Sequence, residues 1–185
     1  NAKNILYRVV FMSDQFDEIF DVLVVGSGCG GLTAALTADI SNPAKVLVIE
    51  KSHLIGGTSA TSGGVIWIPD NHLGKEKGAQ DSLSEAKEYL KATIPADEFN
   101  EPLIDTYLDQ GPKMVKFMEE NTDARYTSLE HYPDYFQDAP GVKLGNRALE
   151  PLPVSADILG DDVDNLHPSG PQTILFGRYG VNFEE

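Results

Sequence analysis

The sequence predicts an α/β fold in which helices flank a parallel sheet, and three observations support this prediction. Residues 20–25 form a short apolar run rich in β-branched side chains, a glycine-rich turn follows at residues 26–31, and a second apolar run spans residues 45–49. Uninterrupted apolar runs of this length are typical of strands buried on both faces of a parallel sheet. Residues 32–38, between the turn and the second strand, are expected to be helical.

The composition excludes several classes of protein. The 185 residues include Lys+Arg 14 and Asp+Glu 29, which gives a net charge of −15, and such a surface repels nucleic acids and anionic lipids. One cysteine cannot form an internal disulfide or a thiolate metal cage. No apolar run approaches the roughly 20 residues that cross a bilayer. We therefore expect a globular, cytoplasmic protein with no nucleic-acid partner, no metal site and no membrane span.

The glycine-rich turn predicts a phosphate-binding site. Gly26 permits the tight turn, Gly28 lets the backbone approach a pyrophosphate, and Gly31 lets the following helix pack against the strand. The helix N-terminus then offers N–H groups and the positive end of its dipole. Glu50 closes the second strand, where an acid is expected to bind ribose hydroxyls and to repel a 2′-phosphate. The pattern alone leaves FAD and NAD as candidate ligands.

A second cluster of small residues, 56–64, follows the acid closely. Nine small residues allow close backbone approach to a large planar or anionic ligand, with hydroxyl and N–H groups as donors. A flexible linker is the alternative. The apolar run 65–68 that follows favours a loop tethered at both ends.

In this order, the two clusters and the acid resemble the flavoproteins that include fumarate reductases and 3-ketosteroid dehydrogenases. The resemblance implies a Rossmann-like FAD-binding domain. In that family the first cluster holds the FAD diphosphate, the acid holds the adenosine ribose, and the second cluster runs toward the isoalloxazine ring. The cofactor-binding residues that it implies are Gly26, Ser27, Gly28, Cys29, Gly30, Gly31, Glu50, Lys51, Gly56, Gly57, Thr58, Ser59, Ala60, Ser62, Gly63 and Gly64.

Two further segments, 65–71 and 131–151, resemble the 3-ketosteroid dehydrogenase branch of this family. The second segment contains Tyr-Pro-Asp-Tyr, Pro-Gly and Glu-Pro in the order that the branch shows. The sequence departs from the branch pattern at Gln137, Asp138, Val142 and Asn146.

The resemblance implies a reaction that desaturates a small, hydrophobic, steroid-like carbonyl substrate, with an electron acceptor that the sequence does not indicate. A base removes the proton α to the carbonyl, and a hydride leaves the β carbon for the flavin. The candidate catalytic residues are Tyr132 and Tyr135. Tyr132 aligns better with the family tyrosine that assists a second tyrosine from later in the chain. A tyrosine serves as the base only if its pKa, ordinarily about 10, is lowered by its surroundings.

The length predicts a fragment. Residues 1–12 are expected to be an upstream extension, with a weak targeting segment as the alternative, and residues 13–185 the N-terminal part of an FAD-binding domain without its substrate domain. Because family enzymes are much longer, the 185 residues alone are expected not to turn over substrate. The alternatives are a fumarate-reductase-type flavoprotein and a non-catalytic nucleotide-binding fragment.

The middle of the chain predicts helices that supply core rather than chemistry. Ser82 and Glu85 form a capping box before a helix that ends at Pro95. A second helix is expected to begin near Pro102, with Leu103, Ile104, Tyr107 and Leu108 inward, and to be separated by Gly111-Pro112 from a third. The acidic run 160–164 is expected to be a solvated loop.

Overall fold

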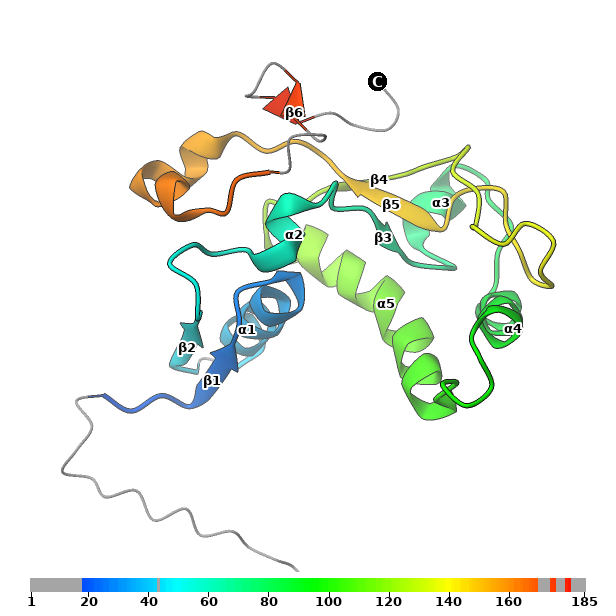
Figure 1. Cartoon of the computed structure of the whole chain (residues 1–185), viewed down its shortest axis with the longest axis horizontal. Coiled ribbons are helices and arrows are strands. Elements are labelled where there is room, and N and C mark those ends of the chain that lie inside the picture. The colour runs from blue at the N-terminus through cyan, green and yellow to red at the C-terminus, as the bar shows by residue number, and fades with distance from the viewer. Residues whose placement is uncertain (1–17, 43, 170–173, 176–178, 181–185) are drawn as a thin grey trace, which may run out of the picture. The chain divides into compact units, whose positions relative to one another are not determined.

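The computed structural model of the chain describes residues 18–42, 44–169, 174–175 and 179–180, in two compact units, Asn1–Lys51 and Ser52–Glu185. The expected extension at residues 1–12 lies outside the described residues. Figure 1 shows the order of the elements along the chain.

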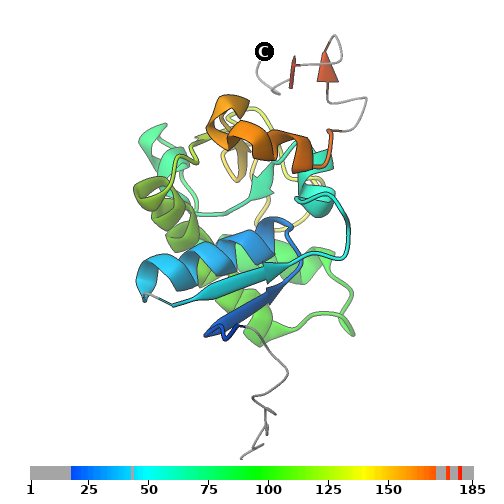
Figure 2. The ribbon, with the colours of Figure 1, turned by 90° about the vertical axis from the view of Figure 1, so that its left-hand side faces the viewer.

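The first unit is a strand–helix–strand motif. Strand β1 (Val22–Val25) pairs in parallel with β2 (Val46–Ile49), and helix α1 (Cys29–Ser41) connects them. This confirms the predicted parallel pairing and its crossover helix. Figure 2 shows α1 lying along one face of the two strands.

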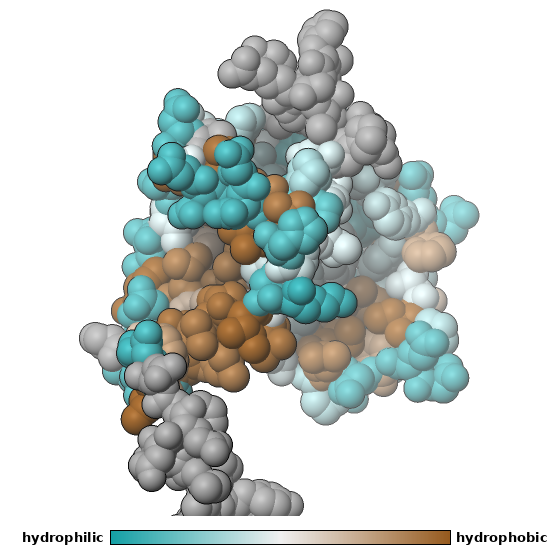
Figure 3. All heavy atoms as spheres, turned by 60° about the vertical axis from the view of Figure 1, so that its left-hand side comes forward, coloured by the Kyte–Doolittle hydropathy of each residue, from teal (hydrophilic) through white to brown (hydrophobic). Residues whose placement is uncertain are grey.

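The prediction that β1 is buried on both faces is wrong for the described residues. Leu23 and Val25 are 58% and 77% exposed, and Ile49 on β2 is 42% exposed. The reason is that, within the described part of the first unit, α1 covers one face of the two strands, and alternate side chains point to the opposite face. Figure 3 shows apolar side chains gathered on one face of the chain.

The second unit contains an antiparallel sheet in the order β3-β5-β4, flanked by helices (Figure 1). Its strands are β3 (Ile66–Trp67), β4 (Tyr126–Ser128) and β5 (Ala148–Pro151). The hydrophobic core is centred on Ile68, Val115 and Leu149.

The remaining elements are mostly short. Helices α2 (Gly57–Thr61) and α3 (His72–Glu76) flank β3 in the sequence. The C-terminal part of the chain contains the 3-10 helix η2 (Ala156–Asn165) and the paired strands β6 (Ile174–Leu175) and β7 (Tyr179–Gly180). The prediction of a loop at residues 160–164 is therefore wrong, because those residues lie in η2. Their acidic side chains are exposed, as expected.

Helix α4 (Leu83–Thr93) begins where the capping box predicts. Ser82 is its N-cap, and its Oγ accepts a hydrogen bond from the Glu85 N–H at 3.3 Å. The Ser82 hydroxyl also donates to Glu85 Oε2 at 2.8 Å. The helix ends at Thr93, before Pro95, as expected.

Helix α5 (Glu101–Asn121) is continuous, so the prediction of two helices separated at Gly111-Pro112 is wrong. The buried face of α5 carries Leu108, Gly111, Val115 and Met118, on both sides of Pro112. Burial of this long stripe favours one helix and overrides the local preference of proline to end it. Leu103, expected to point inward, is 64% exposed, whereas Leu108 is 3% exposed.

The continuity of α5 generates a stability prediction. Pro112→Ala restores a backbone donor inside the helix, and we expect it to raise the free energy of unfolding by about 1–3 kcal/mol. Urea denaturation of the wild-type and variant proteins measures this change. A lower stability of Pro112→Ala would contradict the prediction and would show that the packing of α5 requires the proline.

Candidate functional site

The turn between β1 and α1 presents a helix N-terminus suited to an anion. Gly28 is the N-cap of α1, no side chain caps the helix, and its first turn contains no acidic residue. The first N–H groups of a helix have no intrahelical partner, and the helix dipole is positive at this end. This backbone arrangement is the one in which proteins bind phosphate groups.

Two of the turn glycines are required by the geometry. Gly26 has φ +97°, in the left-handed region, and the Cβ of a side chain at Gly31 would lie 2.0 Å from the Gly26 carbonyl oxygen. The helix therefore passes so close to the end of β1 that residue 31 has no room for a side chain. Gly30 differs, because a Cβ there meets no atom within 4 Å.

Glu50, at the end of β2, reaches the same turn. Its Oε2 accepts hydrogen bonds from the Ser27 N–H at 2.9 Å and from the Ser27 hydroxyl at 2.8 Å. Ser27 is 2% exposed, whereas Cys29 and Lys51 are exposed. The parallel pairing of β1 and β2 thus places the predicted ribose-binding acid beside the predicted phosphate-binding turn.

In the second cluster, residues 57–61 form helix α2 and the remainder is loop. The Thr61 hydroxyl donates to the Thr58 carbonyl at 3.0 Å, and the Ser62 hydroxyl donates to the Ser59 carbonyl at 2.9 Å. These two hydrogen bonds stabilise the backbone of α2 and the residue that follows it. The predicted cofactor contacts of the cluster stay predictions: Gly56, Gly57, Thr58, Ser59, Ala60, Ser62, Gly63 and Gly64.

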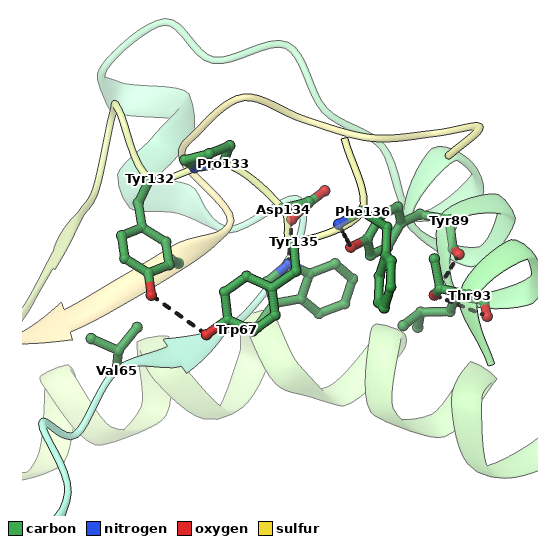
Figure 4. Close-up of a pocket in the computed structure, with 11 residues that line it drawn as sticks. Val65, Trp67, Tyr89, Thr93, Tyr132, Pro133, Asp134, Tyr135 and Phe136 are labelled. Carbon is green, nitrogen blue, oxygen red and sulfur yellow. Dashed lines mark hydrogen bonds between the residues drawn. The ribbon is translucent and has the colours of Figure 1, made fainter. Parts of the chain in front are cut away.

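Both candidate catalytic tyrosines line a pocket of about 340 Å³ in the second unit (Figure 4). Tyr132 is half-buried and Tyr135 is 81% exposed, and their hydroxyl oxygens are 3.5 Å apart. The pocket is mostly apolar, and no Lys, Arg or His is among its described lining residues. These are Val65, Trp67, Tyr89, Leu90, Thr93, Tyr132, Pro133, Asp134, Tyr135, Phe136 and Ala148.

The environment of Tyr132 favours its protonated form. The hydrogen bond with Tyr135, and to a smaller extent burial, raise the pKa of the Tyr132 phenol above its ordinary value. A phenol with a raised pKa is a hydrogen-bond donor at neutral pH and a poor base. The pKa lowering that a tyrosine base needs is therefore not produced by the described residues around Tyr132.

The buried ion pairs beside this pocket were missed in the sequence. Arg147 is 1% exposed and forms ion pairs with Asp81 at 2.7 Å and with Asp134 at 2.8 Å. The three residues lie far apart in the chain, and no periodicity or spacing rule connects them. Only Asp134, between Tyr132 and Tyr135, stood next to a predicted site residue.

The structure accounts for two of the departures from the branch pattern. Asn146 has φ +69°, a left-handed conformation that asparagine adopts more readily than most residues. Val142 follows Gly141 in the segment Pro-Gly-Val. Gly141 has φ +72°, and a Cβ there would lie 2.1 Å from the Glu85 carbonyl oxygen. The backbone therefore requires glycine at position 141. Val142 is half-buried. Nothing in the structure explains Gln137 or Asp138.

The described residues also bear on metal binding and on membrane spans. No group of three or more His, Cys, Asp or Glu side chains among them is arranged to hold a metal ion. Within the same part of the chain, no helix has both the length and the apolar character to cross a membrane.

Comparison with known proteins gives the family. A family model described as "FAD binding domain" matches residues 21–156, which is more than half of the chain. A 3-oxosteroid 1-dehydrogenase of Mycolicibacterium smegmatis is 42% identical over 80% of this chain and 26% of its own length. A 4-oxocyclohexanecarboxylate 2-dehydrogenase of Sinomonas cyclohexanicum is 41% identical over 86% of this chain and 28% of its own length.

A solved structure is similar to this chain at a comparable sequence identity. The 3-ketosteroid delta1-dehydrogenase from Sterolibacterium denitrificans, in complex with 1,4-androstadiene-3,17-dione, matches with a TM-score of 0.80 and 41% identity. The match covers 88% of this chain and 28% of that one. The chain therefore spans less than a third of the length of these relatives.

The close approach of α1 to β1 generates a paired prediction. We expect Gly31→Ala to lower the free energy of unfolding by about 1–3 kcal/mol, because its methyl group overlaps the Gly26 carbonyl. The matched control, Gly30→Ala, is expected to raise it by about 0.5–1 kcal/mol, because alanine favours the helix and has open space there. Urea unfolding of the three proteins measures both changes. Equal effects of the two substitutions would refute this account of the turn.

Proposed function

The chain belongs to the FAD-binding domain family, and from that premise we propose that it forms the FAD-binding part of a dehydrogenase that desaturates a hydrophobic cyclic ketone. The cofactor is FAD. The observation that carries the proposal is that family membership coincides with a glycine-rich turn at a helix N-terminus, a carboxylate beside it, and an apolar pocket lined by two tyrosines.

The residues present fit FAD. The uncapped N-terminus of α1 and the turn at residues 26–31 suit the diphosphate, because they supply backbone donors and no acidic side chain in the first helical turn. We assign the ribose hydroxyls to Glu50, because its carboxylate lies at the turn and would repel a 2′-phosphate. Lys51 and the second cluster, 56–64, are proposed as further contacts.

The proposed reaction removes one hydrogen from each of two adjacent carbons of the ketone. FAD, when bound, accepts the hydride that leaves the carbon β to the carbonyl. A base takes the proton from the α carbon, and the carbonyl oxygen gains negative charge as that proton leaves. A donor placed at this oxygen stabilises the enolate, so the chain's own contribution is to orient the ketone and supply that donor.

We assign the donor role to Tyr132. Its raised pKa keeps the phenol protonated, and the neighbouring Tyr135 hydroxyl can orient it. Tyr135 lies at the exposed rim of the pocket and is proposed as the second active-site tyrosine. The base is assigned to neither of them.

The lining of the pocket favours an uncharged substrate. The two kinds of relative differ here, because one is named for a 3-oxosteroid and the other for an oxo acid that carries a carboxylate. A carboxylate in an apolar pocket needs a cationic partner, and none is among the described lining residues. The same observation opposes a fumarate-reductase-type activity on a dicarboxylate. We therefore propose a steroid-like ketone.

The 185 residues alone are proposed to be inactive. They span 28% of the length of the relative for which a ketone complex is known, which leaves most of such an enzyme outside this chain. A non-catalytic nucleotide-binding role of the isolated chain is the competing proposal. Steady turnover of a ketone by the purified 185-residue chain would contradict the inactivity proposal.

A spectrum and a substrate comparison test the proposal. The purified protein is expected to show flavin absorbance near ~450 nm, and the complete flavoprotein is expected to reduce an artificial electron acceptor with a 3-oxosteroid. The matched substrate is 4-oxocyclohexanecarboxylate, which we expect to react at least about tenfold more slowly, because its charge has no partner in the pocket. Absence of flavin would refute the cofactor, and preference for the carboxylate would refute the substrate class.

Substitution of the tyrosines tests their roles. In the complete flavoprotein, Tyr132→Phe removes the proposed donor and is expected to lower kcat about 10²-fold with little change in KM. Tyr135→Phe is the matched control and is expected to lower kcat less, because its hydroxyl acts through Tyr132. A larger loss in Tyr135→Phe than in Tyr132→Phe would reverse the assignment.

A further inference from the structure

Asp134 is the buried residue of the segment that carries both tyrosines. It is 5% exposed, whereas Tyr132 and Tyr135 on either side of it face the pocket and its rim. Its Oδ1 accepts from the Trp67 indole N–H at 2.6 Å. Its Oδ2 accepts from Arg147 Nη1 at 2.8 Å and from the Lys143 N–H at 2.9 Å. Three donors therefore hold the Asp134 side chain, and through it the backbone between the two tyrosines.

Arg147 connects Asp134 to a second carboxylate on its opposite side. Its Nε donates to Asp81 Oδ2 at 3.0 Å and its Nη2 donates to Asp81 Oδ1 at 2.7 Å, which is the bidentate geometry of a strong pair. Asp81 also accepts from the N–H groups of Asp70 and Ser82. Burial would raise the pKa of Asp81, but the hydrogen bonds and charge of Arg147, with these N–H groups, outweigh it and lower the pKa.

The guanidinium also contacts the aromatic wall of the pocket. Its central carbon lies 5.4 Å from the centroid of the Trp67 ring and 5.9 Å from that of Tyr89. Both rings line the pocket, and the Tyr89 hydroxyl accepts a hydrogen bond from the Phe136 N–H at 3.1 Å. One buried cation thus contacts the pocket wall and, through Asp134, the segment of the tyrosines.

We propose that Asp134 and Arg147 are positioning residues that hold Tyr132 and Tyr135 in their working geometry through this buried ion pair. The inference rests on the proposed function, because it assigns a catalytic purpose to the pair. Asp81 provides the contrast with a purely stabilising role. Its hydrogen bonds among the described residues are to Arg147 and to the N–H groups of Asp70 and Ser82, and none is to residues 131–136.

The chain offers a matched pair of variants. Asp134→Asn places an amide NH2 against Arg147 Nη1 and the Lys143 N–H, if the amide oxygen keeps its bond to Trp67. Asp81→Asn makes the equivalent change on the other side of Arg147, where each carboxylate oxygen accepts from one Arg147 nitrogen and from one backbone N–H. Both variants therefore lose one charge and one set of bonds to the same guanidinium, but only the first alters the support of the tyrosines.

The experiment compares both variants in the complete FAD-loaded flavoprotein. We expect Asp134→Asn to lower kcat about 10- to 100-fold at unchanged FAD content and to speed amide hydrogen exchange at residues 131–136. Asp81→Asn is expected to lower the melting temperature comparably while kcat falls less than about threefold. Equal effects of the two variants on kcat and on exchange at residues 131–136 would overturn the proposal.

Two measures keep the test decisive. If Asp134→Asn does not fold, Trp67→Phe removes the indole donor to Asp134 and keeps an aromatic ring at the pocket wall. Unchanged exchange at residues 131–136 in that variant would overturn the proposal. Hydrogen exchange does not depend on the substrate. A wild-type protein with no ketone activity would therefore refute the proposed function, while the exchange comparison would still decide whether Asp134 holds the tyrosine segment.

Discussion

The buried guanidinium of Arg147 is the interaction on which the pocket of the second unit depends. A charge at 1% exposure is tolerated only when it is fully paired, and Asp81 and Asp134 supply that pairing. The two carboxylates come from the segment before α4 and from the loop between β4 and β5. Satisfying one cation therefore brings together segments distant in the sequence, and the aromatic pocket wall and the two tyrosines are arranged around it.

The first unit depends on a different constraint, the closeness of α1 to the end of β1. A glycine at position 31 allows this approach, and the result is a helix N-terminus whose surroundings suit a diphosphate. Glu50 reaches the same turn because β2 pairs in parallel with β1. The proposed function thus assigns the cofactor to backbone groups and one carboxylate of the first unit, and the substrate to side chains of the second unit.

Features that neighbouring residues determine could be predicted from the sequence. Features that depend on contacts between distant residues could not. The strand, turn, helix, strand and acid follow one another directly, so β1, α1, β2 and the place of Glu50 could be predicted, as could the capping box of α4. The continuity of α5 past Pro112 could not, because burial of a long apolar face decides it. The network of Arg147 joins positions 81, 134 and 147, and no local pattern contains that information.

The proposed function requires that a ketone bound at the tyrosine-lined pocket gives its electrons to FAD held by this chain. Anaerobic mixing of the complete flavoprotein with a 3-oxosteroid, without any electron acceptor, tests it most directly. The account predicts loss of the flavin absorbance near ~450 nm in step with desaturation of one steroid per flavin. An unchanged flavin spectrum in the presence of bound steroid would contradict it.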